Sequence, residues 1–301
     1  MARILFLMML PFVCFSQITP SEDIPVNNLL KEKENLDTKR KASYNLDEIK
    51  VRWKKAALEN CPGVPCVVTP PAPSFTCGTS TVTDFDGNVY ETVAIVGTGV
   101  TQCWTKTNLK VSMYNDGTPI PDLTLAGWPS YSGARTGYDV SVVPLIDYVG
   151  TFGYLYNWYA VNERKLCPDG WHVPTDSDWN KLVISLHSGT TVVDTSSTSS
   201  TQSTTAGTVM KSQVTNTSSG SGLGWNPGSP GTNTSVFTAL PGGYRIGSGS
   251  FLDIRTTAFF WSADAFDGLR AWGRTLNNVS GNVFRNYYGK LFGASVRCLR
   301  D

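Results

Sequence analysis

The densest run of large apolar side chains lies between residues 154 and 179, and it predicts the centre of a hydrophobic core. The aromatic side chains of this run include Tyr154, Tyr156, Trp158, Trp171 and Trp179. Burying a large apolar side chain contributes roughly 1.5–3 kcal/mol, so a cluster of this kind is expected to be packed away from water. Within it, residues 154–161 are expected to form a helix or a helix–strand corner.

A helix is predicted at the C-terminal end of this run. Its apolar stripe recurs at intervals of three and four residues and consists of Trp179, Leu182, Val183 and Leu186. Thr175 stands three residues before Asp178, which is close to a capping box with Asp in the place of the usual Glu or Gln. We therefore expect a helix that begins after Thr175 and buries this stripe.

A hairpin is predicted near the start of the aromatic half of the chain. Residues 81–96 alternate β-branched and polar positions around the dipeptide Asp86-Gly87, which is a strong turn signal. The oxygens of Asp84, Asp86 and Asn88 also match part of a calcium loop. The bidentate Glu that ends such a loop is missing, so we favour the turn over the metal site.

The amino-acid composition and the predicted structure change along the chain after the predicted helix. Residues 188–222 are rich in Ser, Thr and Gly, a composition that buries little apolar area, so a flexible surface segment is expected there. Gly242 and Gly243 are expected to let the backbone turn or approach the aromatic core closely, and Arg245 to pair internally. From residue 259 to residue 301 the pattern predicts short strands.

The N-terminus has the pattern of a secretory signal. Residues 1–16 carry one arginine followed by an apolar run that is too short to span a bilayer, and they predict a cleaved signal peptide. The alternative is a lipoprotein with its lipid on Cys14, but Phe12 and Val13 stand where small residues are usual. We therefore expect export, with a lipid anchor as the less favoured form.

The rest of the chain divides into three further segments. They are a charged leader (17–60) that ends in an amphipathic helix (44–60), a Pro-rich linker (61–76) and one folded domain (77–301). The helix either packs or frays by itself, or it docks a partner. Prolines at the density of the linker favour extended geometry, so the linker is expected to be a semi-rigid spacer.

Charge and composition narrow the class of protein. The formal net charge is +1, which argues against electrostatic binding of nucleic acid or of an anionic membrane. After the signal, no apolar stretch approaches the about 20 residues that a transmembrane helix needs. The charged fraction is only 16% and there are 28 glycines, which suits an exported, loop-rich protein, secreted or on the outer cell surface.

Cysteine usage predicts disulfides. The chain has 7 cysteines, and 6 remain if Cys14 is removed with the signal. An even number in an oxidising compartment favours disulfides over thiol chemistry, and none of these cysteines has the CxxC spacing of a zinc or redox motif. We pair them as follows: Cys167 with Cys298, Cys77 with Cys103, and Cys61 with Cys66.

A series of ordered motifs carries a resemblance to one family. The motifs are GTSTVTDFDGNVYETV, QCWTKTNLKVSMYNDGTPIP, YLYNWYAV, LCPDGWHVPTDSDWNKL, FTALPGGYR, FFWSADA and SVRCLRD. In this order they resemble the Fibrobacter succinogenes major paralogous domain (FISUMP domain) over residues 77–301. The resemblance implies an α+β fold of the C-type-lectin-like kind, shared with formylglycine-generating enzymes, in which short antiparallel strands, two helices and long loops form the domain.

Catalysis is the least expected function. His172 and His187 lie in or beside the predicted helix, and His172 is expected to be structural rather than a metal ligand. The formylglycine-generating relatives hold copper with a cysteine pair near the C-terminus, whereas Cys298 stands alone here. Asp264 and Asp267 are close in sequence but lie in a predicted loop without an evident partner. We expect no catalytic residue, no metal site and no cofactor.

Binding is the favoured class, because folds of this kind present ligands to loops on a rigid core. Tyr, Trp, Arg and Asn are the residue types that contribute most at recognition surfaces, and they concentrate after the FFW motif. The candidate residues are Asp264, Asp267, Arg270, Trp272, Arg285, Asn286 and Tyr287. The alternative for each is an ordinary strand residue of an exported β-rich domain.

The ligand is expected to be a protein or a glycan outside the cell. The acidic–Pro–Asn motif of calcium-dependent sugar-binding lectins is absent, so calcium-dependent carbohydrate capture is not supported. If a retroelement diversified the C-terminal loops, a protein target is favoured. The remaining alternative is a purely structural surface paralogue that its charged leader attaches to the cell.

Overall fold

The computed structural model describes most of the C-terminal three quarters of the chain. The described residues are 74–97, 100–124, 132–138, 147–190, 193–196, 199–214, 223–229 and 231–301. The expected signal peptide, the leader with its helix, residues 61–73 of the linker and the Cys61–Cys66 pair lie outside them. The chain divides into two units, residues 1–75 and 76–301, and the fold described below is that of the second. No helix in the described part is both long and apolar enough to cross a membrane.

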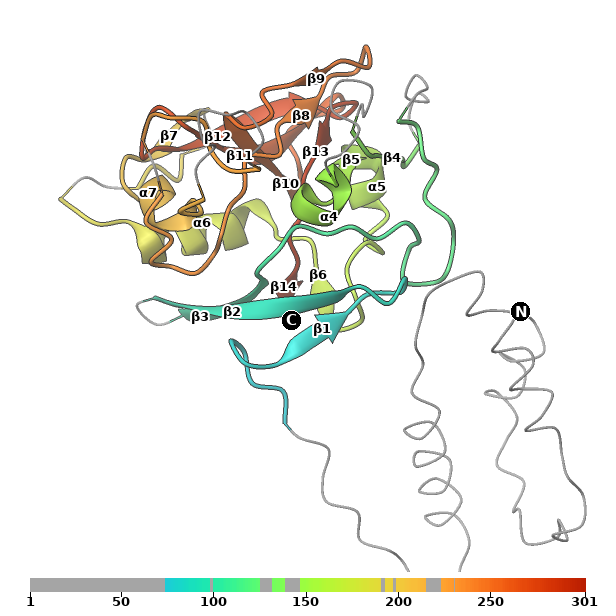
Figure 1. The fold of residues 1–301 in the computed structure, drawn as a ribbon, viewed down its shortest axis with the longest axis horizontal. Helices are drawn as coiled ribbons and strands as arrows, with labels where there is room; N and C mark the ends of the chain where they lie inside the picture. Colours follow the sequence, from blue (N-terminus) through green and yellow to red (C-terminus); the bar gives the residue numbers. More distant parts are fainter. Residues whose placement is uncertain are drawn as a thin grey trace, which may run out of the picture. The chain divides into compact units, whose positions relative to one another are not determined.

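Antiparallel sheets and short helices make this unit an α+β domain (Figure 1). The first sheet has the order β1-β2-β3-β14-β6, with β1 (Thr81–Thr83), β2 (Val89–Gly97), β3 (Val100–Thr105), β14 (Leu299–Arg300) and β6 (Trp171–His172). The second has the order β10-β11-β12-β7, with β10 (Thr257–Ala265), β11 (Arg270–Asn277), β12 (Val283–Gly289) and β7 (Ser200–Ser203). The third has the order β4-β5-β13-β8-β9, with β4 (Arg135–Thr136), β5 (Leu155–Asn157), β13 (Gly293–Ala294), β8 (Tyr244–Arg245) and β9 (Phe251–Leu252).

The hairpin predicted around Asp86-Gly87 is confirmed. Strands β1 and β2 pair, and Gly87 has a φ of 85°, the left-handed conformation that glycine adopts without strain. Asp84 is buried beneath the turn, where its carboxylate accepts hydrogen bonds from the backbone N–H groups of Asp86 and Asn88 and from the Tyr90 hydroxyl. Protein donors therefore occupy the carboxylate of Asp84, one of the three groups that a calcium loop would use.

The predicted helix is also confirmed, as α6 (Asp176–Leu186). The Thr175 side chain accepts a hydrogen bond from the Asp178 N–H, and the Asp178 carboxylate accepts one from the Thr175 N–H, so the capping box is complete. The helix lies between the first and the second sheet, in contact with β2 on one side and with β10 and β11 on the other (Figure 1).

The largest hydrophobic cluster is built around this helix. Trp179 and Trp104 pack at 4.8 Å between ring centroids, and Phe237 and Phe260 close the cluster at 5.7 Å from Trp104 and 5.5 Å from Trp179 respectively. All four side chains are buried. Because these residues come from four distant parts of the sequence, burial of this cluster holds the sheets together.

The aromatic run before α6 forms the expected helix–strand corner. Strand β5 is followed directly by α5 (Trp158–Asn162), and the side chain of Asn157 caps the helix by accepting from the Ala160 N–H. A further short helix, α4 (Tyr148–Phe152), precedes it and packs against Tyr138 at the edge of the domain.

The expectation of a flexible surface segment at residues 188–222 is wrong for much of that segment. It contains β7, which extends the second sheet, and α7 (Ala206–Met210), which is part of the largest hydrophobic cluster. Gly207 makes this possible, since a Cβ there would lie 2.5 Å from the carbonyl oxygen of Asn282. The Nζ of Lys211 then donates to three backbone carbonyls, including those of Asn277 and Ser280. This segment therefore packs through the close approach of small side chains and through the hydrogen bonds of a buried lysine.

The glycine pair before β8 allows the close approach that the sequence predicted. Gly243 has a φ of 66°, and a Cβ on it would lie 2.3 Å from the Leu252 carbonyl oxygen. The following Arg245 is buried, and its guanidinium lies 5.9 Å from the centroid of the Phe251 ring.

Two of the expected disulfides are present. Cys167 joins Cys298, which links the loop before β6 to the start of β14, and Cys77 joins Cys103 on β3. The terminal strand β14 lies between β3 and β6, so the end of the chain is in the centre of the sheet that begins the domain (Figure 1).

Candidate functional site

The predicted ligand-binding residues lie on and around the β10–β11 turn and on β12. Strands β11 and β12 pair so that Trp272 is opposite Tyr287 and Arg274 is opposite Arg285. Successive side chains of a strand point to opposite faces, so these four residues share one face of the second sheet. The α6 helix covers the inner part of that face, and the outer part reaches solvent at the turn.

Phe266, Arg270 and Tyr287 form a stack at this outer end, called here the Arg270 stack. The rings of Phe266 and Tyr287 are 4.1 Å apart and within 10° of parallel. The guanidinium of Arg270 lies 4.3 Å from the Tyr287 centroid and 4.8 Å from that of Phe266. A planar guanidinium over aromatic faces is a favourable arrangement that also keeps its outer side open.

Asp267 holds Arg270 in this position. Its carboxylate accepts from Nε and Nη2 of Arg270 at 2.8 and 2.5 Å, and its other oxygen accepts from the backbone N–H groups of Leu269 and Arg270. These hydrogen bonds, foremost those with Arg270, lower the pKa of Asp267 below its ordinary value. The turn therefore presents a fixed guanidinium rather than a freely moving one.

Trp272 and Arg285 lie beneath the Arg270 stack. Trp272 is only 7% exposed and meets Phe266 edge-on at 4.9 Å. The guanidinium of Arg285 lies 3.6 Å from the Trp272 centroid and donates to the carboxylate of Asp176 at 2.7 Å. Arg285 is buried, so its role is to support Trp272 rather than to face a ligand.

Asp176 joins this support to α6. It also accepts from Nη1 of Arg274 at 2.8 Å, so one carboxylate forms ion pairs with two arginines. Burial acts to raise the pKa of Asp176, but the hydrogen bonds and charges of Arg285 and Arg274 outweigh it, and the pKa is lowered. The carboxylate is therefore ionised at neutral pH, and its negative charge stabilises the two adjacent guanidinium groups.

The remaining two candidates are not part of the exposed face. The carboxylate of Asp264 accepts from the backbone N–H of Asp176 at 2.7 Å, so it satisfies the first turn of α6. Asn286 is on the opposite face of β12, where its Oδ1 accepts from the Ser199 hydroxyl and from the Tyr287 N–H. Sequence reasoning missed Phe266 and Leu269, which are 37% and 68% exposed. The signal that could have found them is the presence of a Phe and a Leu inside a segment predicted to be a loop, where apolar side chains have little core to pack into.

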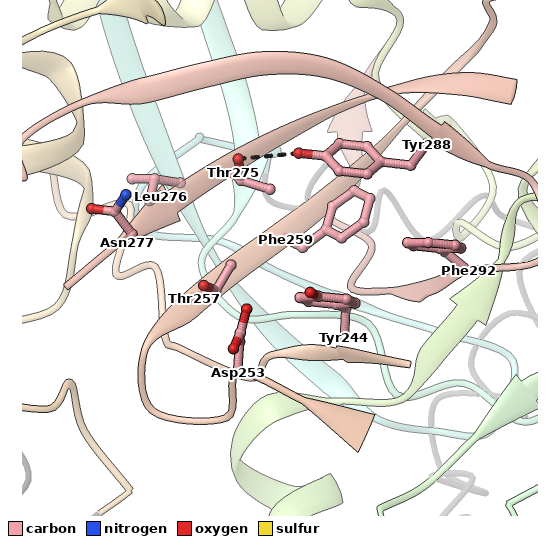
Figure 2. A pocket seen from close by; sticks show the side chains of 9 residues that line it. All are labelled: Tyr244, Asp253, Thr257, Phe259, Thr275, Leu276, Asn277, Tyr288 and Phe292. Carbon is pink, nitrogen blue, oxygen red and sulfur yellow. Dashed lines mark hydrogen bonds between the residues drawn. The ribbon is translucent and has the colours of Figure 1, made fainter. Parts of the chain in front are cut away.

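The opposite face of the second sheet carries a pocket of about 220 Å³ (Figure 2). Four aromatic side chains form one side of it: Tyr244, Phe259, Tyr288 and Phe292. Four polar side chains form the other: Asp253, Thr257, Thr275 and Asn277. We call this the aromatic pocket. This pocket could not be predicted from the sequence, because its residues come from segments that meet only in the folded protein.

His172 belongs neither to the Arg270 stack nor to the aromatic pocket, and it lies between two carboxylates. Its Nδ1 is 2.5 Å from an Asp301 oxygen, and its Nε2 is 3.4 Å from an Asp178 oxygen. The hydrogen bond with Asp178 and then that with Asp301 raise the pKa of His172, although burial opposes them. In the described part of the chain, no group of three or more His, Cys, Asp or Glu side chains is placed to hold a metal ion.

These observations define a disulfide-linked α+β domain with an exposed cation–aromatic surface. The family model of the Fibrobacter succinogenes major domain matches residues 99–300, and the chain belongs to this family. The match begins beside β3, so the β1–β2 hairpin precedes it, although the motif resemblance extended to residue 77. Comparisons with curated proteins and with solved structures found no match.

Proposed function

We propose that this chain is an exported, non-catalytic binding module that presents the Arg270 stack to a protein partner outside the cell. One observation carries the proposal: an exposed guanidinium lies 4.3 and 4.8 Å from the centroids of two nearly parallel aromatic rings, with Leu269 also exposed in the same turn. Arginine and large aromatic residues dominate the binding energy of protein interfaces. Residues fixed before binding also lose less conformational entropy when a partner arrives.

The chemistry of the Arg270 stack favours a protein over a glycan. A sugar offers many hydroxyl groups and needs hydrogen-bonding partners for them. Asp267 already accepts four hydrogen bonds from its own turn, two of them from the Arg270 side chain. What the stack offers is flat aromatic and aliphatic surface with one cation, which suits the apolar centre of a protein interface.

Two further parts of the proposal concern the fold class and the location. We infer a C-type-lectin-like domain, supported by the antiparallel sheets around a central helix and by the late strands that carry the stack. We infer a secreted or outer-surface bacterial protein, supported by the signal-like N-terminal sequence and by two disulfides, which persist in oxidising compartments.

The test is binding of the purified full chain to an array of surface proteins and glycans. We expect a protein on the array to be bound, and the variants Phe266→Ala and Arg270→Ala to lose at least tenfold in affinity. Lys165→Ala is the matched control, because Lys165 forms a comparable exposed ion pair with Asp116 at 2.9 Å in another turn. It should bind as the unaltered chain does, with calcium or with a chelator.

Equal binding by all three variants would refute the Arg270 stack as the binding surface. Binding only to glycans would refute the protein partner. If the folded chain binds nothing on the array, and removal of residues 17–76 abolishes retention at the cell surface, the structural alternative replaces this proposal.

A further inference from the structure

The aromatic pocket has two chemically different sides. On one side, neighbouring rings are in contact: Phe259 and Tyr288 lie 4.2 Å apart between centroids, and Tyr244 lies 6.0 Å from Phe259. Phe292 extends this surface, parallel to Tyr244 within 2° (Figure 2). Carboxylate, amide and hydroxyl groups of Asp253, Asn277 and two threonines form the other side. Figure 2 shows the two groups of side chains facing one pocket from β10, β11, β12 and the flanking segments.

We propose that the aromatic pocket binds one unit of a neutral saccharide, at a site separate from the Arg270 stack. A sugar ring has C–H groups on its face and hydroxyl groups at its edge. The C–H groups can pack on the aromatic side, whose faces carry partial negative charge. The hydroxyl groups can then bond to the polar side, where both donors and acceptors are present. The proposal does not depend on the function proposed for the stack.

The polar side is held in place by bonds within the protein. The Oδ1 of Asn277 accepts from the N–H groups of Val279 and Ser280, which fixes the amide and leaves Nδ2 as its donor. The hydroxyl groups of Thr275 and Tyr288 are 3.3 Å apart. Burial, and then the charge of Asp253 and a hydrogen bond to it, raise the pKa of Tyr244, so that hydroxyl keeps its proton. A pre-organised set of polar groups is what distinguishes a binding site from a chance hollow.

Phe259 can form the floor of the pocket because the neighbouring strand has a glycine there. A Cβ on Gly273 would lie 2.6 Å from the Phe259 ring. The ring therefore lies directly against the β11 backbone. It is only 1% exposed and packs against Tyr288 at 4.2 Å between centroids, so it supports the partly exposed rings of Tyr244, Tyr288 and Phe292, which are the ones that can contact a ligand.

An organic cation is the competing ligand, because aromatic rings with a carboxylate also bind quaternary ammonium groups. Such a cation is surrounded by rings, each with its centroid within about 6 Å of the charge. In the aromatic pocket, neighbouring rings touch one another and form one surface, so a methylated ammonium group does not fit between them. Pockets for drug-sized ligands measure about 300–1,000 Å³, so one of about 220 Å³ suits a single sugar ring.

The test uses isothermal titration of the full chain with neutral trisaccharides: cellotriose, xylotriose, mannotriose and chitotriose, all in the presence of a chelator. We expect at least one to bind. Phe292→Ala removes one ring of the aromatic side and should weaken binding at least tenfold. Asp253→Asn is the milder variant, because Asn tolerates the left-handed backbone of Asp253 (φ 57°), and loss of its charge-assisted hydrogen bond should weaken binding about fivefold.

Phe266→Ala is the matched control, an aromatic truncation on the other face of the same sheet, and it should leave saccharide binding unchanged. Conversely, Phe292→Ala should leave protein capture by the Arg270 stack unchanged, so the two proposals fail separately. Failure of the folded chain to bind any of the four trisaccharides would overturn this one. So would tighter binding of tetramethylammonium, or equal loss in the Phe266→Ala variant.

Discussion

Arg270 and Arg285 both lie on aromatic rings, yet they serve different purposes because they differ in burial. The Arg270 pair with Asp267 has side chains that are 42% and 37% exposed, so solvent screens the pair and it contributes little to folding. Arg285 is only 5% exposed in its side chain and is bound to Asp176. A substitution at Arg270 can therefore change binding while the fold is kept, whereas one at Arg285 changes both.

His172 gives the protein a dependence on pH in the neutral range. Because its pKa is raised in the folded state, the protonated form stabilises the fold, fully at a pH below about 6.5. This stabilisation is lost as the pH rises through the folded-state pKa. The side chain is 38% exposed, so we expect the effect to stay under about 1 kcal/mol, or about 2–4 °C in Tm. Thermal melts across this range check it.

The variant His172→Gln should remove this step in the melting profile. The matched control is His187→Gln, since His187 contacts the Ser203 hydroxyl at 2.8 Å rather than a carboxylate. A step that survives in His172→Gln but disappears in His187→Gln would contradict the assignment.

At the scale of elements, α6 is held to the second sheet by polar contacts at its first turn and by apolar contacts along its length. Asp176 binds Arg274 on β11 and Arg285 on β12, and Asp264 on β10 accepts from the Asp176 N–H. All three long strands of the second sheet are therefore connected to one residue of the helix. The Arg270 stack lies just beyond this junction, so the junction fixes the surface that carries it.

Asp176→Asn tests this junction. It leaves Arg274, whose side chain is fully buried, and Arg285 without their carboxylate, and we expect a loss of about 3 kcal/mol in the free energy of unfolding. For a domain of this size that corresponds to a Tm lower by roughly 6–12 °C. Asp267→Asn breaks an exposed arginine pair instead and should cost much less, because solvent screens that pair. Chemical denaturation measures both, and equal losses would show that the junction does not anchor α6.

Elements were predictable from the sequence where a few neighbouring residues determine them. The capping box of Thr175 and Asp178 and the Asp86-Gly87 turn each act within four residues, and both appear in the structure as expected. Strand β7 and helix α7 could not be predicted in this way. Their burial depends on Gly207 fitting against Asn282 and on Lys211 meeting carbonyls up to 69 residues away. Composition alone made that segment resemble a surface loop.

At the scale of the whole molecule, the candidate site was only partly predictable for the same reason. The sequence pointed to residues on and around β11 and β12, and of these Asp267, Arg270 and Tyr287 do meet. It could not show that Arg285 is buried by a partner 109 residues away, nor that Phe266 lies on Tyr287. Those facts depend on the register of β11 and β12 and on the position of α6, which residue types do not reveal.

The two disulfides should differ in their effect on the stability of the whole domain. Cys167 and Cys298 are 131 residues apart, whereas Cys77 and Cys103 are 26 apart. On the chain-entropy account, closing these loops stabilises the fold by about 5 and about 3.5 kcal/mol respectively. We therefore expect the double variant Cys167→Ala/Cys298→Ala to lose more free energy of unfolding than Cys77→Ala/Cys103→Ala, as measured by chemical denaturation.

The position of Cys298 is a second reason to expect the larger loss of stability from the Cys167–Cys298 variant. Cys298 is fully buried and precedes β14, the strand that places the end of the chain between β3 and β6. If the Cys167–Cys298 bond is removed, the two-residue strand, the hydrogen bonds of the buried Arg297 and the surrounding packing still hold the C-terminus, but hydrogen exchange at Leu299 should increase. Free thiols at Cys167 and Cys298 in non-reducing peptide mapping, or a greater loss from the Cys77–Cys103 variant, would show that the C-terminus does not depend on this disulfide.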